Sequence, residues 1–333
     1  MLPCDGCPAP APPPWPEPYR SAPTDAAAAR VAEPAPAPGL RARAVLVGFW
    51  LLGSLPLRVS HWLGGRWGGS RRGRVRHIVE RNLALCFPEL DAAARGRLAD
   101  ATLAEAGRSM LEAFRIWTRP RAMLARIVRV DGEDVLAAAR AEGRGVLLLA
   151  PHLGAWELLN LYLAATGPGA VLYKPPASPA LESAIVHARA RLGMGQIRAD
   201  RSAPRTIIRR LAQGDLVGIL PDQQPRAGEG VFAPFFGLQA LTMTLAPRLA
   251  QRAPTLIGWA ERLPDAVGYV LHFRRAPAEL ADPDPAVAAA AMNAAIEATA
   301  RQAPAQYVWT YKRFSKVPPG EPKRYGPETR RRR

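Results

Sequence analysis

A histidine and a glutamate stand five residues apart at the end of a hydrophobic run, in "LLLAPHLGAWELLNLYLAA", residues 147–165. His152 follows Pro151 directly, and Glu157 lies in an apolar stretch whose pattern predicts a helix. A histidine in a loop and a carboxylate in the first turns of the next helix can face each other. The carboxylate would then hold one ring nitrogen while the other takes a proton. That arrangement is a general base suited to removing a proton from an alcohol.

The same spacing also fits a structural role, in which the histidine is hydrogen-bonded at a strand end and the glutamate is exposed on a helix. The other histidines do not cluster as metal ligands do; they are His61, His77, His187 and His272. The sequence contains no G-x-S-x-G elbow, no P-loop and no G-x-G-x-x-G turn. The sequence thus predicts no metal site and no competing active-site motif, and residues 152 and 157 are the strongest candidates for chemistry.

Short apolar runs bounded by glycine or proline alternate with helical patterns through the second half of the chain. "GRGVLLLAP" is typical of a buried strand, "AWELLNLYLAA" of a helix, and "DLVGILPDQQP" of a further strand and turn. This alternation predicts an α/β fold with a largely parallel, helix-covered sheet. Ligands of such sheets bind beyond the carboxyl ends of the strands. His152 comes just after such an end.

Composition divides the chain into four parts. Residues 1–40, with "PAPAPPPWPEPYRSAP", predict a disordered Pro/Ala-rich tail. Residues 41–70 predict a membrane anchor or an interfacial helix that precedes the α/β fold. We expect one domain over residues 71–317, followed by a basic C-terminal tail over residues 318–333.

The segment "RARAVLVGFWLLGSLPLRVSHWLGG" is the most hydrophobic stretch. Its uncharged part, Ala44 to Leu57, has about fourteen residues, fewer than the roughly twenty of a spanning helix. Trp50, Trp62 and Trp67 suit a short anchor or a helix lying in the headgroup zone. An ordinary buried first helix remains the alternative. If the segment spans, the arginines that follow it place the main domain in the cytoplasm.

A formal charge of +17 favours anionic partners. These include an anionic lipid or an acidic protein, whereas no nucleic-acid-binding signature occurs, so we expect no nucleic-acid partner. The cysteines predict neither a zinc site nor a disulfide framework; they are Cys4, Cys7 and Cys86.

The run "LLLAPHLGAWELLNLYLAATG" resembles the H-x4-D/E block of the lysophospholipid acyltransferase-like superfamily, and more narrowly the bacterial lipid A biosynthesis (lauroyl/myristoyl) acyltransferases. Further blocks resemble this family in the same order: "RNLALCFPEL", "YKPP", "ILPDQQPRAGEGVFAPFFGLQALTMT" and "APAQYVWTYKRFSK". Together they cover roughly residues 44–316. The chain departs from the pattern at Ala155, where asparagine is common, and at Tyr311-Lys312-Arg313, which replaces a more usual His-Arg-Arg.

The resemblance implies transfer of a fatty acyl chain from an acyl carrier protein thioester to a hydroxyl of a lipid A precursor, in lipopolysaccharide biosynthesis. It implies no cofactor, an anionic glycolipid acceptor, and a bacterial inner-membrane location with the catalytic domain facing the cytoplasm. His152 would be the general base and Glu157 its orienting partner.

The resemblance also extends to candidate substrate-binding residues. Lys174 would contact a phosphate or an oxyanion, or is simply an exposed base. Asp222 and Gln223 match a D-Q element that contacts substrate or forms a turn. Phe235 and Phe236 would shape the acyl pocket. One of Arg189 and Arg191 would contact acceptor phosphate or the carrier protein.

Two other functions remain open at this point. A closely similar block occurs in acyltransferases that act on other glycolipids, such as phosphatidylinositol mannosides. A non-catalytic basic protein that binds anionic membranes is the second alternative.

Overall fold

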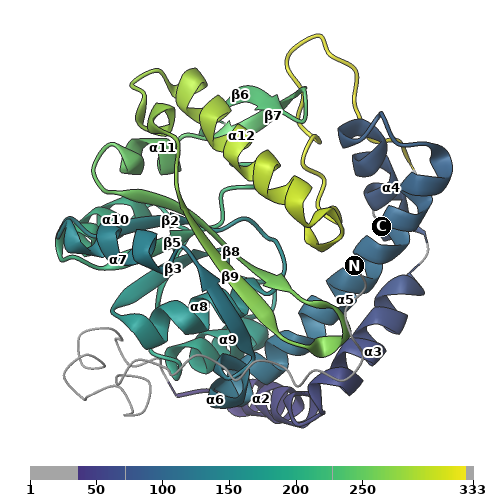
Figure 1. Cartoon of the computed structure of the whole chain (residues 1–333), viewed down its shortest axis with the longest axis vertical. Helices are drawn as coiled ribbons and strands as arrows, with labels where there is room; N and C mark the ends of the chain where they lie inside the picture. Colours follow the sequence, from purple (N-terminus) through teal and green to yellow (C-terminus); the bar gives the residue numbers. More distant parts are fainter. Residues whose placement is uncertain (1–36, 72, 227, 328–333) are drawn as a thin grey trace, which may run out of the picture.

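The computed structural model describes residues 37–71, 73–226 and 228–327. Its main sheet has seven strands in the order β1-β9-β8-β2-β5-β3-β4. All neighbouring pairs are parallel except β8 and β9. The predicted α/β architecture with a largely parallel sheet is therefore confirmed (Figure 1). The strands of this sheet are β1 (Ile127–Asp131), β2 (Val146–Leu149), β3 (Gly169–Tyr173), β4 (Gly195–Arg198), β5 (Leu216–Ile219), β8 (Thr255–Arg262) and β9 (Tyr269–Arg275).

Helices cover both faces of the sheet. Side chains of β2 alternate between two apolar cores: Leu147 and Leu149 pack on one face, and Val146 and Leu148 on the other. Because both faces are buried, β2 is apolar throughout rather than alternating. The helices are α4 (Arg74–Cys86), α5 (Ala92–Thr118), α6 (Pro120–Leu124), α7 (Glu133–Ala141), α8 (Trp156–Thr166), α9 (Pro179–Ala190), α10 (Ala203–Ala212), α11 (Leu245–Ala250) and α12 (Pro285–Gln302).

A separate hairpin, β6 (Gly230–Phe235) and β7 (Leu238–Met243), packs against α12 (Figure 1). Its turn is Phe236-Gly237, and both residues have positive φ, 50° and 71°. A two-residue turn with both φ values positive matches the right-handed twist of the paired strands. The "FFG" motif is therefore explained locally by the turn of this hairpin.

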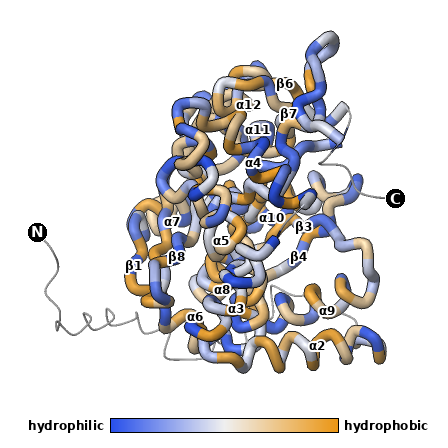
Figure 2. The backbone as a smooth tube through the Cα atoms, turned by 90° about the vertical axis from the view of Figure 1, so that its right-hand side faces the viewer, coloured by the Kyte–Doolittle hydropathy of each residue, from blue (hydrophilic) through white to orange (hydrophobic). Residues whose placement is uncertain are grey.

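The hydrophobic segment predicted over residues 41–70 forms two helices rather than one. They are α2 (Leu40–Gly53) and α3 (Leu57–Gly69), bent by 107° across a short break at residues 54–56. No single helix among the described residues is long and apolar enough to cross a membrane, although this bent pair passes by length and composition. α2 runs along one end of the molecule as a largely hydrophobic stretch (Figure 2).

Glycines bring α3 close to α5. A side chain on Gly64 or Gly68 would overlap the backbone of α5, and a side chain on Gly107 of α5 would overlap the Gly64 carbonyl. Gly64 and Gly68 of "HWLGGRWGG" are thus explained by close helix packing. Tryptophans and aliphatic residues on the opposite sides of α2 and α3 are left exposed; they include Val47, Trp50, Leu51, Val59, Trp62 and Trp67.

The C-terminal segment, described as far as residue 327, folds back onto α4. The Tyr325 hydroxyl donates to Asn82 Oδ1 at 2.6 Å, and Arg81 donates to the Arg324 carbonyl at 2.6 Å. Of the tail predicted over residues 1–40, residues 1–36 lie outside the part of the chain that the structure describes.

A buried ionic cluster joins the N-terminal helices to the sheet. Arg262, at the end of β8, forms ion pairs with Glu112 and Glu105 of α5. Glu112 also accepts from Tyr269 Oη at 2.8 Å and lies 3.0 Å from His61 Nε2 of α3. Burial alone would raise the pKa of Glu112, but the Arg262 charge and these hydrogen bonds lower that pKa to about 2.

We predict that Glu112→Gln lowers the free energy of unfolding by about 3 kcal/mol, because removing one partner of a buried ion pair leaves a buried charge less compensated. The effect falls at the lower end of the usual range because Arg262 keeps Glu105. Urea unfolding at neutral pH measures it. The control is Glu80→Gln, which breaks a partly exposed pair with Arg76 and should change stability little.

The contribution of Glu112 to the free energy of unfolding depends on pH. Since the pKa of Glu112 is depressed, its stabilising effect is present above the ordinary value of 4.5 and is lost as the pH falls toward about 2. The difference between wild type and Glu112→Gln should therefore shrink over that window. A difference that stays constant with pH would contradict the assignment.

Candidate active site

His152 and Asp222 form a hydrogen-bonded pair beyond the ends of two neighbouring strands. β2 and β5 are parallel, and Leu149 is paired with Ile219 in register. Residues three positions beyond these partners therefore meet. His152 Nδ1 lies 2.7 Å from Asp222 Oδ1, and the backbone N–H of His152 donates to Asp222 Oδ2 at 2.8 Å. One carboxylate thus holds both the ring and the backbone of the histidine.

The Asp222 carboxylate is fully buried, with 1% of its surface exposed. Burial alone would raise the pKa of Asp222, but the neighbouring His152 charge and the hydrogen bonds from its ring and backbone lower that pKa below its usual value. An ionised Asp222 accepts a hydrogen from Nδ1, which leaves the lone pair on Nε2. The Gln223 amide nitrogen lies 3.4 Å from Nε2, as a donor to that lone pair would.

Glu157 forms no hydrogen bond with His152 in this structure, so its predicted role as the orienting partner stays a prediction. Glu157 is buried at 5% exposure, and its carboxylate forms an ion pair with Arg189 of α9. It also accepts from Trp117 Nε1 at 2.9 Å. The residue that faces the histidine from α8 is Trp156, whose ring lies edge-on at 5.5 Å between centroids.

The physical reason lies in strand order. Sequence spacing brings residue 157 near residue 152 along the chain, but a parallel neighbouring strand brings Asp222 to it across the sheet. Glu157, at the first turn of α8, instead compensates the charge of the largely buried Arg189. Burial alone would lower the pKa of Arg189, and the Glu157 charge raises it. A catalytic role of Glu157 stays a prediction.

The loop that carries His152 is held on several sides. The Gly154 N–H donates to the Gln306 carbonyl at 3.1 Å, and Ser109 Oγ donates to the Gly154 carbonyl at 3.2 Å. The Val308 N–H donates to the His152 carbonyl at 3.1 Å. Gly154 has a φ of 61°, and a side chain there would overlap the Ala260 carbonyl. The sequence interpretation missed Ser109 and Gln306, although "APAQYVW" was already singled out as a family block.

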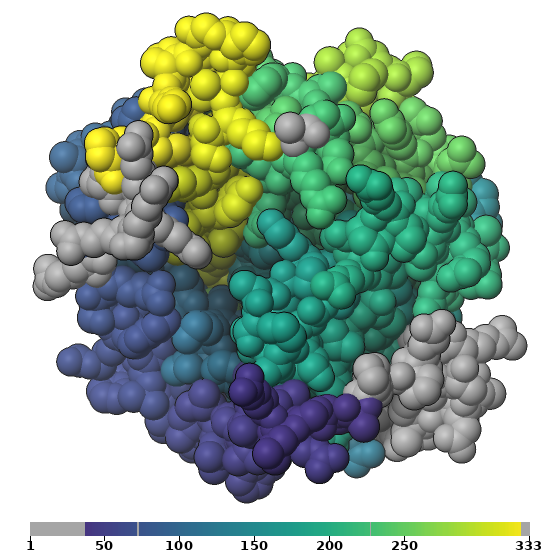
Figure 3. Space-filling view, turned by 180° about the vertical axis from the view of Figure 1, so that it is seen from behind, coloured from purple at the N-terminus to yellow at the C-terminus, as the bar shows by residue number. Residues whose placement is uncertain are grey.

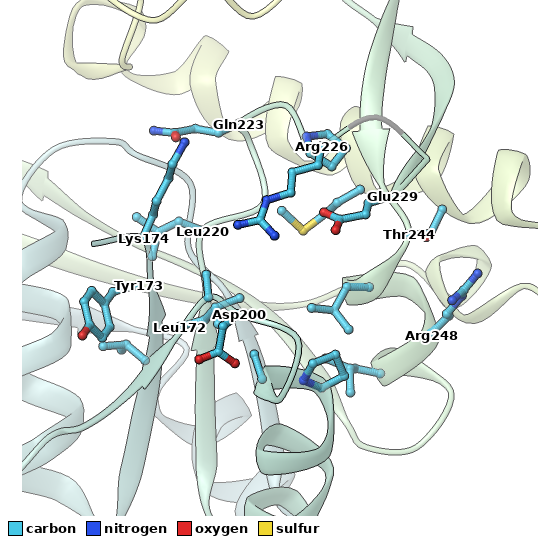
Figure 4. Close-up of a pocket in the computed structure, with 18 of the residues that line it drawn as sticks. Leu172, Tyr173, Lys174, Asp200, Leu220, Gln223, Arg226, Glu229, Thr244 and Arg248 are labelled. Atoms are coloured by element: carbon cyan, nitrogen blue, oxygen red, sulfur yellow. The ribbon is translucent and has the colours of Figure 1, made fainter. Parts of the chain in front are cut away.

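His152 lines a cavity of about 1290 Å³ that extends beyond the carboxyl ends of the parallel strands. Its lining includes apolar side chains such as Leu172, Ile208, Leu220, Leu245 and Leu249. It also includes several arginines and one lysine, but few acids. In the close-up, Lys174 points toward Gln223, while Arg226 reaches toward the middle of the cavity (Figure 4). This surface suits an apolar chain attached to an anionic group.

The predicted substrate-binding residues divide into two sets. Lys174, Arg189 and Gln223 line the cavity together with His152, while Asp222 lies behind the histidine. Arg191, at the end of α9, is exposed and lies outside the cavity lining.

Phe235 and Phe236 do not line this cavity, so their expected role in shaping an acyl pocket stays a prediction. Both are buried in the apolar core beside Trp309 and Phe314. They lie there because β6 and the hairpin turn direct them toward α12 and the C-terminal segment rather than toward His152.

The arrangement can perform proton abstraction from a hydroxyl. His152 Nε2 faces a partly apolar cavity, and Nδ1 is oriented by an ionised carboxylate. The Gln223 amide lies beside Nε2, and Lys174 lines the same cavity. Among the described residues, no group of three or more histidine, cysteine or acidic side chains could hold a metal ion.

Comparison with known proteins gives a consistent result. The model of the bacterial lipid A biosynthesis acyltransferase family matches residues 40–316. The lipid A biosynthesis lauroyltransferase of Escherichia coli (strain K12) is 31% identical over 284 residues, covering 83% of this chain and 92% of the relative. The palmitoleoyltransferase of the same strain is 30% identical over 282 residues, covering 83% and 91%. Its myristoyltransferase is 27% identical over 266 residues, covering 77% and 79%.

We predict that Glu157→Gln lowers the free energy of unfolding by about 3–5 kcal/mol, because it leaves the Arg189 guanidinium buried without its charge partner. Urea unfolding measures the loss. The double variant Glu157→Gln/Arg189→Gln should lose less than the sum of the two single changes. Glu142→Gln, which breaks exposed pairs with Arg144 and Arg275, is the matched control and should change stability little. Equal effects of Glu157→Gln and Glu142→Gln would contradict a buried pair at Glu157.

Proposed function

The chain belongs to the bacterial lipid A biosynthesis acyltransferase family and is an acyltransferase of lipopolysaccharide biosynthesis; from this premise we propose that His152 and Asp222 are its catalytic pair. The acyl donor is an acyl carrier protein thioester, and the acceptor is a hydroxyl of a lipid A precursor. The observation that supports this mechanism is the pairing of His152 Nδ1 with the buried Asp222 carboxylate at 2.7 Å.

The reaction follows from this geometry. His152 Nε2 takes the proton of the acceptor hydroxyl while the hydroxyl oxygen attacks the thioester carbonyl carbon. The tetrahedral intermediate then collapses, the carbon–sulfur bond breaks, and the imidazolium returns the proton to the thiolate. The products are an ester and a free thiol. Asp222 stabilises the imidazolium, and Lys174 and Gln223 are the candidates to stabilise the oxyanion.

The chemical character of the cavity lining suits both substrates. Its apolar lining offers a place for the acyl chain beside His152, and Lys174 and Arg226 offer cations to the phosphates of the acceptor. A thioester is already activated, so the step needs no further cofactor. Arg191 lies outside this lining, so its contact with acceptor phosphate or with the carrier protein stays a prediction.

We further propose that α2 and α3 lie in the membrane interface, with the catalytic domain on the cytoplasmic side of the inner membrane. The exposed tryptophans support this because indole rings favour the headgroup zone. Arg66 lies 5.5 Å from the Trp62 ring and Arg71 lies 4.1 Å from the Trp67 ring. Cations at the level of these rings suit anionic headgroups.

The activity is tested by mass spectrometry of a lipid A precursor incubated with acyl carrier protein loaded with lauroyl, myristoyl or palmitoleoyl chains. Wild type should add one acyl mass. His152→Ala and Asp222→Asn should each lower the rate by about 10²–10⁴, because the base is lost or no longer oriented. Asp131→Asn, at the end of β1 and away from the cavity, is the matched control and should keep the wild-type rate.

Other results of this assay would change the proposal in specific ways. Wild-type turnover in Asp222→Asn would remove Asp222 from the mechanism. Product from wild type only with a phosphatidylinositol mannoside would replace the proposed acceptor. No product from any acceptor, together with intact lipid binding, would support the non-catalytic alternative.

Membrane association is tested by cosedimentation with vesicles that contain anionic phospholipid. Val47→Glu/Leu51→Glu places two charges on side chains of α2 that are 58% and 57% exposed. We expect a partition coefficient lowered about tenfold or more, because charged groups resist insertion beside the acyl chains. Val128→Glu/Val287→Glu changes two exposed valines on β1 and α12 and should bind like wild type. Unchanged binding of the α2 variant would contradict the proposed orientation.

A further inference from the structure

α10 presents two very different faces. Ala203, Ile207 and Leu211 are buried in the core beneath it. The opposite side exposes Arg205 and Arg209, which form no ion pair among the described residues, and the apolar Ile208, which is 39% exposed. An exposed isoleucine between two unpaired arginines contributes nothing evident to the stability of the monomer.

This side of α10 adjoins the cavity that contains His152. Ile208 lines the cavity, and so do Leu245 and Leu249 of α11. Arg248 of α11 and Arg252 just after it also line the cavity and are exposed. The cavity therefore reaches a margin formed by α10 and α11, where apolar side chains are flanked by arginines from both helices. In the close-up, Arg248 lies on this side of the cavity (Figure 4).

This margin lies apart from the surface proposed to meet the membrane. α2 lies at one end of the molecule, whereas α10 and α11 lie farther along its long axis (Figures 1 and 2). In the space-filling view, the purple surface of α2 is at the bottom, and the teal and green surface is above it (Figure 3). A membrane that contacts α2 leaves the margin of α10 and α11 facing the aqueous side.

We propose that Arg205, Ile208 and Arg209 of α10, together with Arg248 and Arg252, form the docking surface for an acidic protein that carries the acyl chain as a thioester. The arginines complement the acidic surface, and Ile208 supplies the apolar centre of a polar-rimmed interface. The acyl chain reaches His152 through the cavity from this margin. The inference rests on the proposed function and adds to it the place where the donor binds.

The test compares two donors of the same lauroyl group: lauroyl-loaded acyl carrier protein, and lauroyl-pantetheine, which lacks the protein. The variant is Arg205→Glu/Arg209→Glu, whose side chains lie outside the cavity lining. We expect kcat/KM with the carrier protein to fall about tenfold or more, mainly through KM, because like charges then face each other. With lauroyl-pantetheine the value should equal that of wild type.

The matched control is Arg97→Glu/Lys323→Glu, which makes the same change of charge at two exposed positions on α5 and the C-terminal segment. It should behave like wild type with both donors. An equal fall with both donors in the α10 variant, or no fall with the carrier protein, overturns the docking surface.

A binding measurement separates this inference from the proposed function. Labelled lauroyl-loaded carrier protein should bind wild type more weakly as salt rises and should bind the α10 variant weakly at all salt concentrations. If wild type transfers no acyl group but shows this binding, the proposed reaction fails and the surface stands. If the α10 variant loses binding to anionic vesicles instead, the surface meets a membrane and the inference fails.

Discussion

The ion pair between Arg262 and Glu112 is the interaction on which the rest of the arrangement depends. It attaches α5, and through His61 also α3, to the end of β8. Gln306 bonds to both the N–H and the carbonyl of Arg262, and its own carbonyl accepts from Gly154. The contacts that hold the N-terminal helices thus also hold the loop that carries His152. A buried pair contributes little net stability when compared with apolar packing, so its value here lies in fixing one geometry.

Two buried carboxylates near the cavity have separate tasks. Asp222 orients His152 because β2 and β5 are neighbours in register. Glu157 holds Arg189 and Trp117, and so connects α8, α9 and α5 beside the cavity. A substitution at either residue would abolish activity if the site collapsed, so loss of activity alone does not distinguish them. Stability does distinguish them, since only Glu157 compensates a buried arginine.

The sequence predicts the α/β class and the position of the site because strands and helices have different apolar periods, and because His152 follows a strand end. It does not predict which acid meets His152, since that depends on the order of strands in the sheet, which no local spacing encodes. The sequence identifies Asp222 and Gln223 as the D-Q element, but it does not decide whether they contact substrate or form a turn. The family resemblance places Phe235 and Phe236 at an acyl pocket, whereas the positive-φ turn at Phe236 and Gly237 is visible only in the backbone. Residues 41–70 are predicted as one segment, whereas the structure has two helices with Pro56 just before the second.

The proposed binding surfaces give the reaction a spatial order. A lipid acceptor stays at the membrane, and a carrier protein stays in water, so one site must be reachable from both. On the side of the carrier the cavity meets this requirement, because it joins the carboxyl ends of the strands near His152 to the margin of α10 and α11. Arginines at that margin attract an acidic carrier without placing charge beside the apolar face of α2. If the membrane-facing surface of α2 and the carrier-binding margin of α10 and α11 coincided, membrane and carrier would compete for the same residues. The separation of α10 from α2 avoids that competition.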